Sequence, residues 1–353
     1  MRVVVTGATG NVGSALLRLL GEEPEVEEIV GFARRVPDVE LPKVRWVAGD
    51  VLDHDLVELF RGAAAVIHLA WLIQPAHDRE QVRRVNVDGS ARVFDAVGEA
   101  RVPTLIHASS LGAYGPGPSD DEERRVDETW PTTGIPTSYY SVDKVAAEEL
   151  LYAFEEQHSA VRIVRLRPGL IFQRSAAQEI RRYFLGPFWP SPLVRPGRMP
   201  IAPVPQGLRF QVVHTDDIAE AYRLVLVHPN ARGAYNVAAD PPITPSRLRE
   251  VLGGIPVPVP RGLLRAGAAL SWRGRLQPAA PGWVDMGYES PLMDTSRIRD
   301  LGWTPKHSGP ETLFELLAGL RDRSGGATPP LRADAGGPLR TGEIRSRVGG
   351  RLN

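Results

Sequence analysis

One short stretch near the N-terminus restricts the possible folds of this chain more than any other. Residues Thr6–Gly13 read Thr-Gly-Ala-Thr-Gly-Asn-Val-Gly; they follow the β-branched run Val3–Val5 and precede an apolar helical pattern. A strand, a glycine turn and a helix in this order bring backbone N–H groups and a helix N-terminus against a pyrophosphate. Gly7 is expected to take turn dihedrals, Gly10 to let the backbone approach the phosphates, and Gly13 to let the helix pack closely on its strand. The first gap is one residue wider than usual, and a glycine turn of purely structural purpose is the alternative.

Strand and helix patterns alternate through the first two-thirds of the chain. The strands are nearly unbroken apolar runs, which is typical of strands covered by helices on both faces. The sequence therefore predicts an α/β fold with a doubly wound, parallel, Rossmann-like sheet. The expected strands are Val3–Thr6, Glu28–Phe32, Val44–Val47, Ala65–Leu69, Leu105–Ala108, Val161–Leu166 and Gln211–Val213. The expected helices are Val12–Leu20, Leu56–Phe60, Val82–Glu99, Tyr140–Glu156 and one from Thr215 or Asp216 to about Val227.

Two proline-rich regions interrupt this alternation and divide the chain. We expect a dinucleotide-binding domain over residues 1–168, continued by about 211–238, and a smaller substrate lobe formed by residues 169–210 and 239–320. Open α/β sheets bind ligands at the carboxyl ends of their strands, which such a lobe would cover. From Asp322 onward glycine, proline and arginine dominate, so residues 322–353 are predicted to be a disordered tail.

Composition excludes several classes of function. The 42 basic and 42 acidic residues balance, which argues against a nucleic-acid or membrane partner. The chain has no cysteine, so disulfides, thiolate catalysis and cysteine-bound metals are excluded. The histidines show no HExxH or other ligand spacing, and no metal site is predicted. Without a signal-peptide pattern or a run of about 18 apolar residues, the sequence favours a soluble, cytoplasmic protein.

A tyrosine and a lysine supply the first chemical signal. Tyr140 and Lys144 are four residues apart, so their side chains share one face of the expected helix. A nearby ammonium favours the phenolate, which would lower the pKa of Tyr140 and let it act as a general acid or base. Ser110 follows the strand Leu105–Ala108 and could donate a hydrogen bond to the same substrate oxygen. The alternative is a surface tyrosine beside a solvated lysine.

Further motifs accompany these residues in a fixed order. With them the chain resembles the extended short-chain dehydrogenase/reductase family, often called NAD-dependent epimerases/dehydratases, from Met1 to about Leu320. The motifs are Thr6–Gly13, Gly49-Asp50-Val51, His68-Leu69-Ala70, Asn86-Val87-Asp88-Gly89, Ser109-Ser110, Ala113-Tyr114-Gly115, Tyr140 to Lys144, Arg167-Pro168-Gly169, Val213-His214-Thr215-Asp216-Asp217 and Tyr235-Asn236-Val237.

The resemblance implies roles for individual residues. Tyr140 is the general acid/base, Lys144 also holds the nicotinamide ribose, and Ser110 is the catalytic hydroxyl. Asn86 is expected behind the lysine. The glycine turn and the resemblance together assign the cofactor to Gly7, Thr9, Gly10, Asn11, Val12, Gly13, Arg34, Arg35, Asp50, Val51, Leu69, Ala70, Asn86, Tyr140, Lys144, Pro168 and Gly169. Outside this set, His68, His107 and His214 are expected to be core or supporting residues, and Asp53 and Asp216 have the alternative role of helix caps.

Two departures from better-known members narrow these expectations. The second strand ends in Arg34 and Arg35 with no acidic residue, and arginine matches a phosphate bidentately, so NADP(H) is favoured while NAD(H) stays possible. The alternative is that one or both arginines merely face solvent. Leu111 and Gly112 stand where sugar dehydratases carry acidic residues, which argues against water elimination.

The substrate is predicted less sharply. Apolar residues at Trp71–Ile73 and Phe184–Trp189 suit a moderately apolar carbonyl or alcohol, whereas Arg181, Arg182 and Arg195 could meet the phosphate of a nucleotide-sugar. The first hypothesis is an NAD(P)-dependent oxidoreductase; the alternatives are a nucleotide-sugar epimerase and a non-catalytic NAD(P)-binding regulator. A homodimer is expected from the resemblance, through Val82–Glu99 and Tyr140–Glu156. The candidate substrate residues are Trp71, Ser110, Leu111, Gln173 and Gln211.

Overall fold

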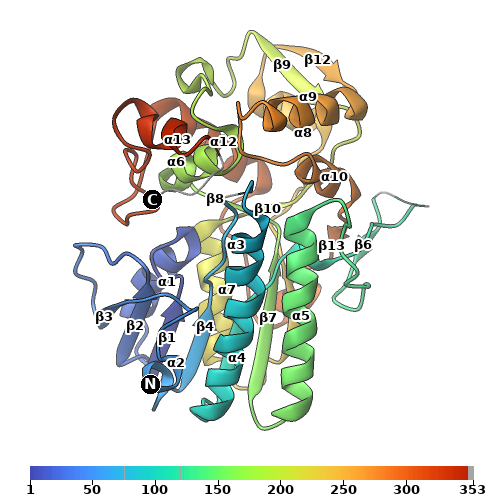
Figure 1. Ribbon diagram of the computed structural model, residues 1–353. Coiled ribbons are helices and arrows are strands. Elements are labelled where there is room, and N and C mark those ends of the chain that lie inside the picture. The colour runs from blue at the N-terminus through green and yellow to red at the C-terminus, as the bar shows by residue number, and fades with distance from the viewer. Residues whose placement is uncertain (75, 120, 122, 349–353) are drawn as a thin grey trace.

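A seven-stranded parallel sheet forms the centre of the computed structural model, which describes residues 1–74, 76–119, 121 and 123–348. The strand order is β11-β7-β5-β4-β1-β2-β3, so the chain winds outward in both directions from β1 (Figure 1). This confirms the doubly wound α/β fold predicted from the sequence. The strands are β1 (Arg2–Thr6), β2 (Glu28–Ala33), β3 (Val44–Ala48), β4 (Ala65–His68), β5 (Thr104–Ala108), β7 (Arg162–Pro168) and β11 (Gly233–Val237).

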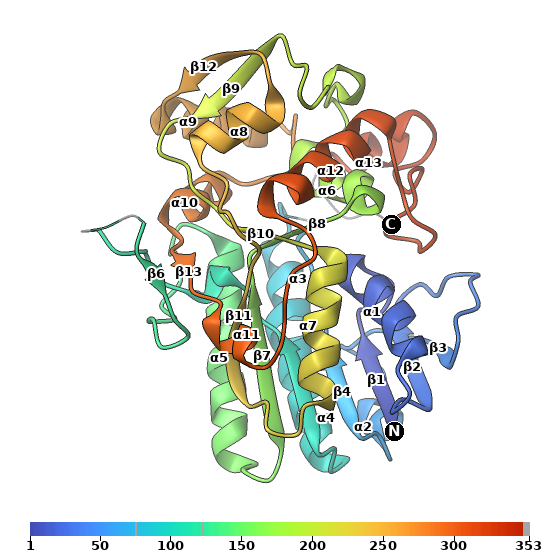
Figure 2. The ribbon, with the colours of Figure 1, turned by 180° about the vertical axis from the view of Figure 1, so that it is seen from behind.

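Helices cover both faces of the sheet. On one face α1 (Asn11–Glu22) and α7 (Thr215–Val227) pack on Val3 and Val5 of β1, and on the other the intervening Val4 faces a second buried cluster. Successive side chains of a strand point to opposite faces, so one apolar run supplies two cores. Figures 1 and 2 show these two layers from the front and from behind. The helices of the second layer are α2 (Leu56–Phe60), α4 (Gly89–Glu99) and α5 (Tyr139–Gln157).

The helix predicted over Val82–Glu99 is interrupted. It consists of α3 (Arg79–Arg83), a π-helical turn (Arg84–Asp88) and α4, and the extra residue of a π-turn changes which side chains face the sheet. At its end Gly89 packs so closely that a Cβ there would lie 2.8 Å from Cγ2 of Val51.

Two helix N-caps differ from the expected ones. Asp55, not Asp53, caps α2 by accepting a hydrogen bond from the Glu58 amide at 3.1 Å. His214, not Asp216, caps α7: its Nδ1 accepts from the Asp216 amide at 3.2 Å. Each of these residues stands directly before the first residue of its helix, a position that the presence of acidic residues nearby does not locate.

A smaller lobe lies over the carboxyl ends of the strands (Figure 1). It contains two short parallel strand pairs, β8 with β10 and β9 with β12, while β6 with β13 forms a third pair beside it. These strands are β6 (Arg125–Val126), β8 (Leu170–Phe172), β9 (Ile201–Pro205), β10 (Val212–His214), β12 (Ile255–Val259) and β13 (Leu292–Met293). The remaining helices are α6 (Ala177–Ile180), a π-turn (Arg181–Leu185), α8 (Pro245–Leu252), α9 (Arg261–Arg273), α10 (Gly282–Glu289), α11 (Ser296–Asp300), α12 (Gly309–Asp322) and α13 (Thr341–Arg345), with short 3₁₀ turns at Leu111–Ala113, Arg174–Ala176, Ser191–Leu193 and Pro338–Arg340.

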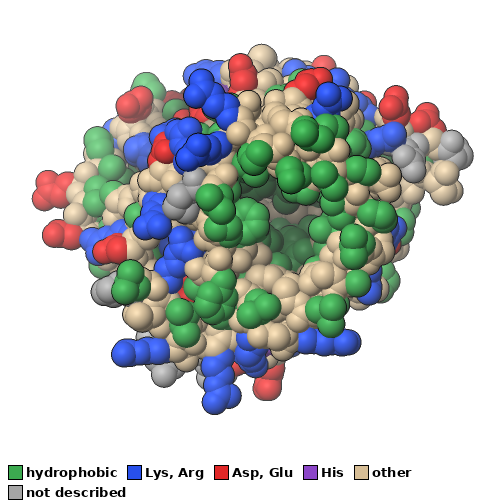
Figure 3. Space-filling model, turned by 90° about the horizontal axis from the view of Figure 1, so that it is seen from above, with side chains coloured by type: hydrophobic (Ala, Val, Ile, Leu, Met, Phe, Trp, Pro, Cys, Tyr) green, Lys and Arg blue, Asp and Glu red, His purple; other side chains and the backbone are tan. Residues whose placement is uncertain are grey.

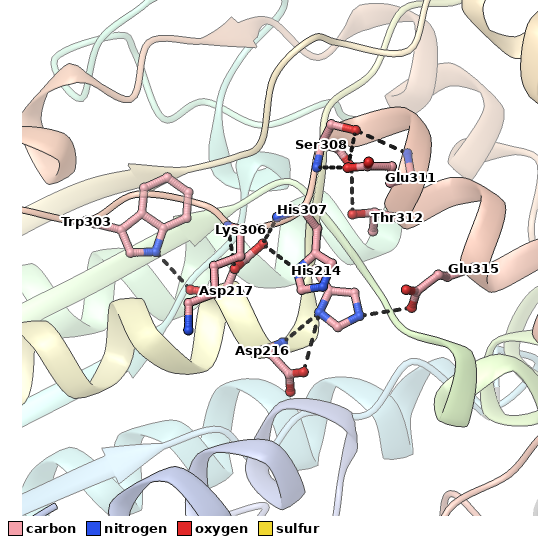
Figure 4. A network of polar contacts seen from close by, with 10 residues as sticks. All are labelled: His214, Asp216, Asp217, Trp303, Lys306, His307, Ser308, Glu311, Thr312 and Glu315. Carbon is pink, nitrogen blue, oxygen red and sulfur yellow. Dashed lines mark hydrogen bonds and ion pairs between the residues drawn. The ribbon is translucent and has the colours of Figure 1, made fainter.

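A polar network ties the segment before α12 to the start of α7 (Figure 4). The Asp217 carboxylate accepts the amides of Lys306 and His307 at 2.9 and 3.0 Å, and its backbone carbonyl accepts the Trp303 indole N–H at 2.8 Å. Nε2 of His214 lies 3.2 Å from the Glu315 carboxylate on α12. Because Asp217 is buried and both of its carboxylate oxygens accept hydrogen bonds, this network fixes α12 on the sheet domain.

The segment after Asp322 differs from the disordered tail predicted from its composition. Residues 323–348 lie against the lobe and the glycine turn, while residues 349–353 lie outside the described residues. The Thr328 hydroxyl donates to the backbone carbonyl of Thr9 at 2.7 Å, and Glu343 forms a buried ion pair with Arg181 at 2.5 Å. Composition does not reveal this packing because single contacts to distant residues, such as the bonds of Arg340 to the Pro187 and Trp189 carbonyls, carry it. Among the described residues, no helix has the length and apolarity needed to cross a membrane.

Candidate active site

A cavity of about 360 Å³ lies at the carboxyl edge of the sheet, between the strand ends and the lobe. It is the place where parallel α/β sheets bind ligands. Most of the residues predicted for the site line it: Gly7, Thr9, Gly10, Asn11, Val12, Gly13, Arg34, Arg35, Asp50, Val51, Leu69, Ala70, Trp71, Ser110, Leu111, Tyr140, Lys144, Pro168 and Gly169.

The glycine turn forms a cradle that side chains would fill. Gly7 has a φ of 71°, and a Cβ there would lie 2.7 Å from the Ala70 amide nitrogen. A Cβ on Gly13 would lie 2.5 Å from the Gly7 carbonyl oxygen. No side chain caps the N-terminus of α1, so its first N–H groups face the cavity without a side-chain partner. The cradle therefore fits the pyrophosphate of a dinucleotide.

Three groups from distant parts of the chain meet at the other end of the cavity. Tyr140 packs on the bare face of Gly112, where a Cβ would lie 2.9 Å from Cε1 of the ring, and its phenol hydrogen-bonds to Ser110. Lys144 Nζ donates to the Ala108 carbonyl at 2.7 Å and lies 3.4 Å from the centroid of the Trp71 ring. The structure brings together Ser110, Tyr140 and Lys144, the residues for which the sequence predicted a shared site.

The electrostatics of this group differ from the expectation that Lys144 lowers the pKa of Tyr140. Burial raises the pKa of Tyr140 to about 12, and the hydrogen bond from Ser110 only partly opposes this. Burial also lowers the pKa of Lys144 to about 7, against the opposing charges of Glu148 and Asp143. Desolvation outweighs charge attraction here because Nζ faces Ala108 and Trp71 and lies 5.7 Å from the Tyr140 ring centroid.

The lowered pKa of Lys144 predicts a pH-dependent stability. Its folded pKa of about 7 lies below the unfolded value near 10.5, so the unfolded chain binds more protons between these pH values and stability falls as pH drops toward 7. Lys144→Met removes this penalty. We expect the free energy of unfolding of the variant, relative to the wild type, to be higher at pH 6 than at pH 9, by roughly 1.4 kcal/mol for each pH unit between about 7 and 9. An equal difference at both pH values in denaturation experiments would contradict the prediction.

Three predicted site residues lie outside the cavity lining. Asn86 does not face it: its side chain accepts the Leu72 amide at 2.7 Å and donates to the Leu72 carbonyl at 2.9 Å, which fixes the wall behind Trp71. Gln173 donates to the Asn11 side chain at 2.7 Å and supports the glycine turn. Gln211 is buried and pairs with both backbone groups of Met293. Both glutamines form their hydrogen bonds with residues distant in sequence, Asn11 and Met293, which come close only in the folded chain.

The histidines lie in the core or in the supporting network, as predicted. His68 is buried between Thr6 and Ser90, at 2.7 and 3.0 Å, and burial lowers its pKa to about 3. Burial lowers the pKa of His107 as well. Although no metal site is predicted from spacing, His214, His307 and Glu315 offer ligand atoms within 4.8 Å of one another. Nδ1 of His214 accepts an amide while its Nε2 bonds Glu315, so these groups already satisfy one another.

The lobe contributes cavity residues that the sequence did not indicate. Glu179 and Tyr183 line the cavity and hydrogen-bond to each other at 3.0 Å, and burial raises the pKa of Glu179 to about 7. Trp283 lies 4.8 Å from Tyr140 between ring centroids, and Pro330 closes the cavity from the C-terminal segment. Glu179, Tyr183 and Trp283 lie on short helical segments, which show too little of an apolar period to be placed from the sequence, and Pro330 lies in an irregular segment.

Comparison with known proteins agrees with this architecture. A family model described as "NAD dependent epimerase/dehydratase family" matches residues 3–238. A UDP-glucose 4-epimerase of Thermus thermophilus, solved with NAD, is 22% identical with a TM-score of 0.64, covering 91% of this chain and 99% of that one. DesIV of Streptomyces venezuelae, a dTDP-glucose 4,6-dehydratase, is 20% identical with a TM-score of 0.65, covering 91% and 97%. At these identities the structures show a shared fold.

Sequence relatives include both short enzymes and much longer proteins. An uncharacterized protein of Mycobacterium tuberculosis (strain H37Rv) is 26% identical over 330 residues, which cover 92% of this chain and 31% of that protein. This chain therefore spans about a third of the length of that relative. An NAD-dependent glucose-6-phosphate dehydrogenase of Haloferax volcanii is 31% identical over 199 residues, 51% of this chain and 72% of the enzyme.

Proposed function

The chain belongs to the NAD dependent epimerase/dehydratase family, and on this premise we propose that it is an NAD(P)-dependent oxidoreductase acting on a carbonyl or alcohol. The bound nicotinamide would supply or accept the hydride. The observation that carries the proposal is the meeting of Ser110, Tyr140 and Lys144 at one end of a cavity whose other end is the glycine cradle. The Haloferax volcanii relative, a dehydrogenase by name, supports the same class of reaction.

Each residue of the group has a distinct task in this proposal. Tyr140 exchanges a proton with the substrate oxygen, for which its hydrogen bond to Ser110 prepares the geometry. Ser110 donates a hydrogen bond to the charge that develops on that oxygen, a contribution often worth about 3 kcal/mol. Lys144 holds positive charge near the phenol when it is protonated, which lowers the energy of the phenolate.

An apolar substrate fits the cavity better than a nucleotide-sugar. The wall near Tyr140 is formed by Trp71, Leu111, Phe184 and Trp283, among others. The arginines that could have met a sugar-linked phosphate have partners elsewhere. Arg181 is buried in its ion pair with Glu343, Arg182 donates to the Pro330 carbonyl, and Arg195 does not line the cavity.

The oxidoreductase and epimerase hypotheses differ in their net use of cofactor. Purified protein is mixed with NADPH or NADH and a panel of apolar ketones, aldehydes and nucleotide-sugars, and absorbance at the nicotinamide band is followed together with product. An oxidoreductase consumes one reduced cofactor for each product formed. Conversion of a nucleotide-sugar without net loss of reduced cofactor would support the epimerase, and cofactor binding without any turnover would support the regulator.

We also propose that NADP(H) is preferred over NAD(H). Arg34 and Arg35 are exposed at the end of β2 and line the cavity, and no acidic side chain of β2 lies there to bind a ribose 2′-hydroxyl. The positive charge of Arg34 acts across the cavity on Tyr183, where it opposes the rise in pKa that burial causes.

The arginine pair therefore gives a prediction on cofactor choice. We expect Arg34→Ala to weaken NADPH binding by about tenfold or more, because a charge-assisted bond to phosphate is worth roughly 1.5–3 kcal/mol, while NADH binding changes little. Fluorescence titration with both cofactors measures the difference. Arg45→Ala, on the exposed end of β3 and outside the cavity, is the matched control. Equal losses for the two cofactors would show that Arg34 does not meet a 2′-phosphate.

A further inference from the structure

One end of the molecule carries an unusual number of exposed apolar side chains. Most of the large apolar residues that remain exposed lie in the lobe, between residues 188 and 276. Viewed from above the lobe, hydrophobic side chains gather around a hollow in the surface (Figure 3). Single exposed apolar residues are ordinary, but a gathered set marks an interaction site. The residues used in the argument, called the apolar face below, are Ile201 and Ile255 on the paired strands β9 and β12 and Leu263 and Leu270 on α9.

Helix α9 contributes an amphipathic surface to the apolar face. No residue of this helix is buried. Leu263 and Leu270 are 66% and 69% exposed, and because they are seven residues apart they lie on the same side of the helix. The neighbouring strand β12 exposes Ile255 to 70% in the same lobe (Figure 1). A helix of the sheet domain would bury such leucines, so α9 and β12 present apolar surface that no described part of the chain covers.

The chain segment that forms β12 and α9 carries charges of one sign. From Ile255 to Pro281 the chain has arginines but no acidic residue, in contrast to its overall balance. Arg261 and Arg265 lean toward Asp285 of α10, whereas Arg273 and Arg275 lie at the C-terminal end of α9. Basic side chains also gather at one side of the hollow in Figure 3. Because Asp285 and Glu289 offset Arg261 and Arg265, the local excess of positive charge comes from Arg273 and Arg275.

The apolar face is connected to the wall of the active-site cavity. Trp272 of α9 stacks on His77 with ring centroids 4.4 Å apart. Gln74 donates to the Pro278 carbonyl at 3.2 Å, and it follows directly on the cavity residues Trp71–Ile73. A molecule resting on the apolar face would thus lie next to the segment that forms the apolar wall.

We propose that the apolar face docks on an anionic lipid surface, with α9 lying in the interface. An apolar helix side flanked by arginines is the pattern of helices that rest in the headgroup region, where apolar burial and attraction to anionic lipids add. A second copy of the chain is less suited, because the same arginines would face one another across a two-fold interface. The expected homodimer helices α4 and α5 lie beside the sheet, away from α9 (Figure 1).

The proposal is tested by sedimentation of the full chain with vesicles. We expect the protein to bind vesicles of phosphatidylglycerol and to bind phosphatidylcholine vesicles far less, with binding weakened by salt. The variant Leu263→Asp/Leu270→Asp should lose about a hundredfold in partitioning, and Arg273→Gln about fivefold. Val36→Asp/Val142→Asp, which places the same two new charges on exposed apolar positions outside the lobe, should bind as the wild type does.

Several results would overturn the proposal. Absence of binding to anionic vesicles, or unchanged binding by the α9 double variant, contradicts it. Light scattering that shows a wild-type dimer dissociated by the double variant assigns the face to a second copy instead. Because the substituted side chains are exposed, the melting temperature of each variant should equal that of the wild type, and this measurement verifies that the variants fold. Docking does not depend on the proposed chemistry: Tyr140→Phe is expected to bind vesicles normally, so failure of the oxidoreductase proposal is recognised separately.

Discussion

Replacement of Tyr140 by phenylalanine should lower kcat by about two to four orders of magnitude while leaving cofactor affinity within a few-fold. General acid–base catalysis by a positioned side chain typically contributes a factor of this size. The ring itself would stay in place, because its packing on Gly112 and beside Trp283 does not involve the hydroxyl. Steady-state rates with the best substrate of the panel, together with cofactor titration, separate these two effects.

The control for this prediction is Tyr152→Phe on the same helix. Tyr152 is half-exposed, lies outside the cavity and loses only a contact to Arg167. Its activity should match that of the wild type within a factor of about two to three. Turnover retained by Tyr140→Phe would remove this residue as the acid/base, and with it the central role in the proposed reaction.

The largest loss of stability is expected from Arg167→Met. The Arg167 guanidinium is fully buried and donates to both carboxylate oxygens of buried Glu148, at 2.8 and 2.5 Å. Although burial alone would raise the pKa of Glu148, hydrogen bonds from Arg167 and Ser109 keep it below its ordinary value. Removing the arginine leaves a carboxylate buried without its counter-ion, which costs about 3–5 kcal/mol. Chemical denaturation at neutral pH measures this loss.

Two companion variants show whether the buried charge is the cause. Arg165→Met, two residues earlier on β7, also removes a buried guanidinium, but its partner Glu155 is 38% exposed and can recover water, so the loss should be smaller. The double variant Arg167→Met/Glu148→Met removes both charges and should recover part of the stability. A double variant less stable than Arg167→Met would mean that the arginine acts through contacts other than Glu148, such as its bonds to Tyr114 and the Glu128 carbonyl at 3.1 and 3.0 Å.

The part of the architecture that depends on repeating patterns could be predicted from the sequence. Apolar runs such as Val3–Val5 identify buried parallel strands because both of their faces need apolar side chains. The glycines at 7 and 13 identify the cradle because the local chain geometry leaves no room for a side chain there. Tyr140 and Lys144 share a helix face through their spacing alone. Spacing alone does not assign Ser110 to the site of Tyr140, which lies about 30 residues later. Only the order of several motifs connected the two residues.

The features that could not be predicted depend on contacts between segments distant in sequence, which no helical or strand periodicity connects. Gln173 and Gln211 look like site residues in sequence because they follow or precede site strands, yet each is used by a partner that folding brings close, Asn11 and Met293. The predicted lowering of the Tyr140 pKa is wrong because spacing gives proximity to Lys144 but not the depth of burial. The pairing of Arg181 with Glu343 joins positions 162 residues apart, which no local rule connects.

The bond between Thr328 and Thr9 has a practical consequence for handling the protein. Thr328 holds its segment against the glycine turn, and Pro330 lines the cavity, so a reporter or tag inserted between these residues would stand beside the proposed cofactor cradle. An affinity handle placed instead in the exposed turn at Gly62, between α2 and β4, avoids this interference because nothing lies within 4 Å of a Cβ there.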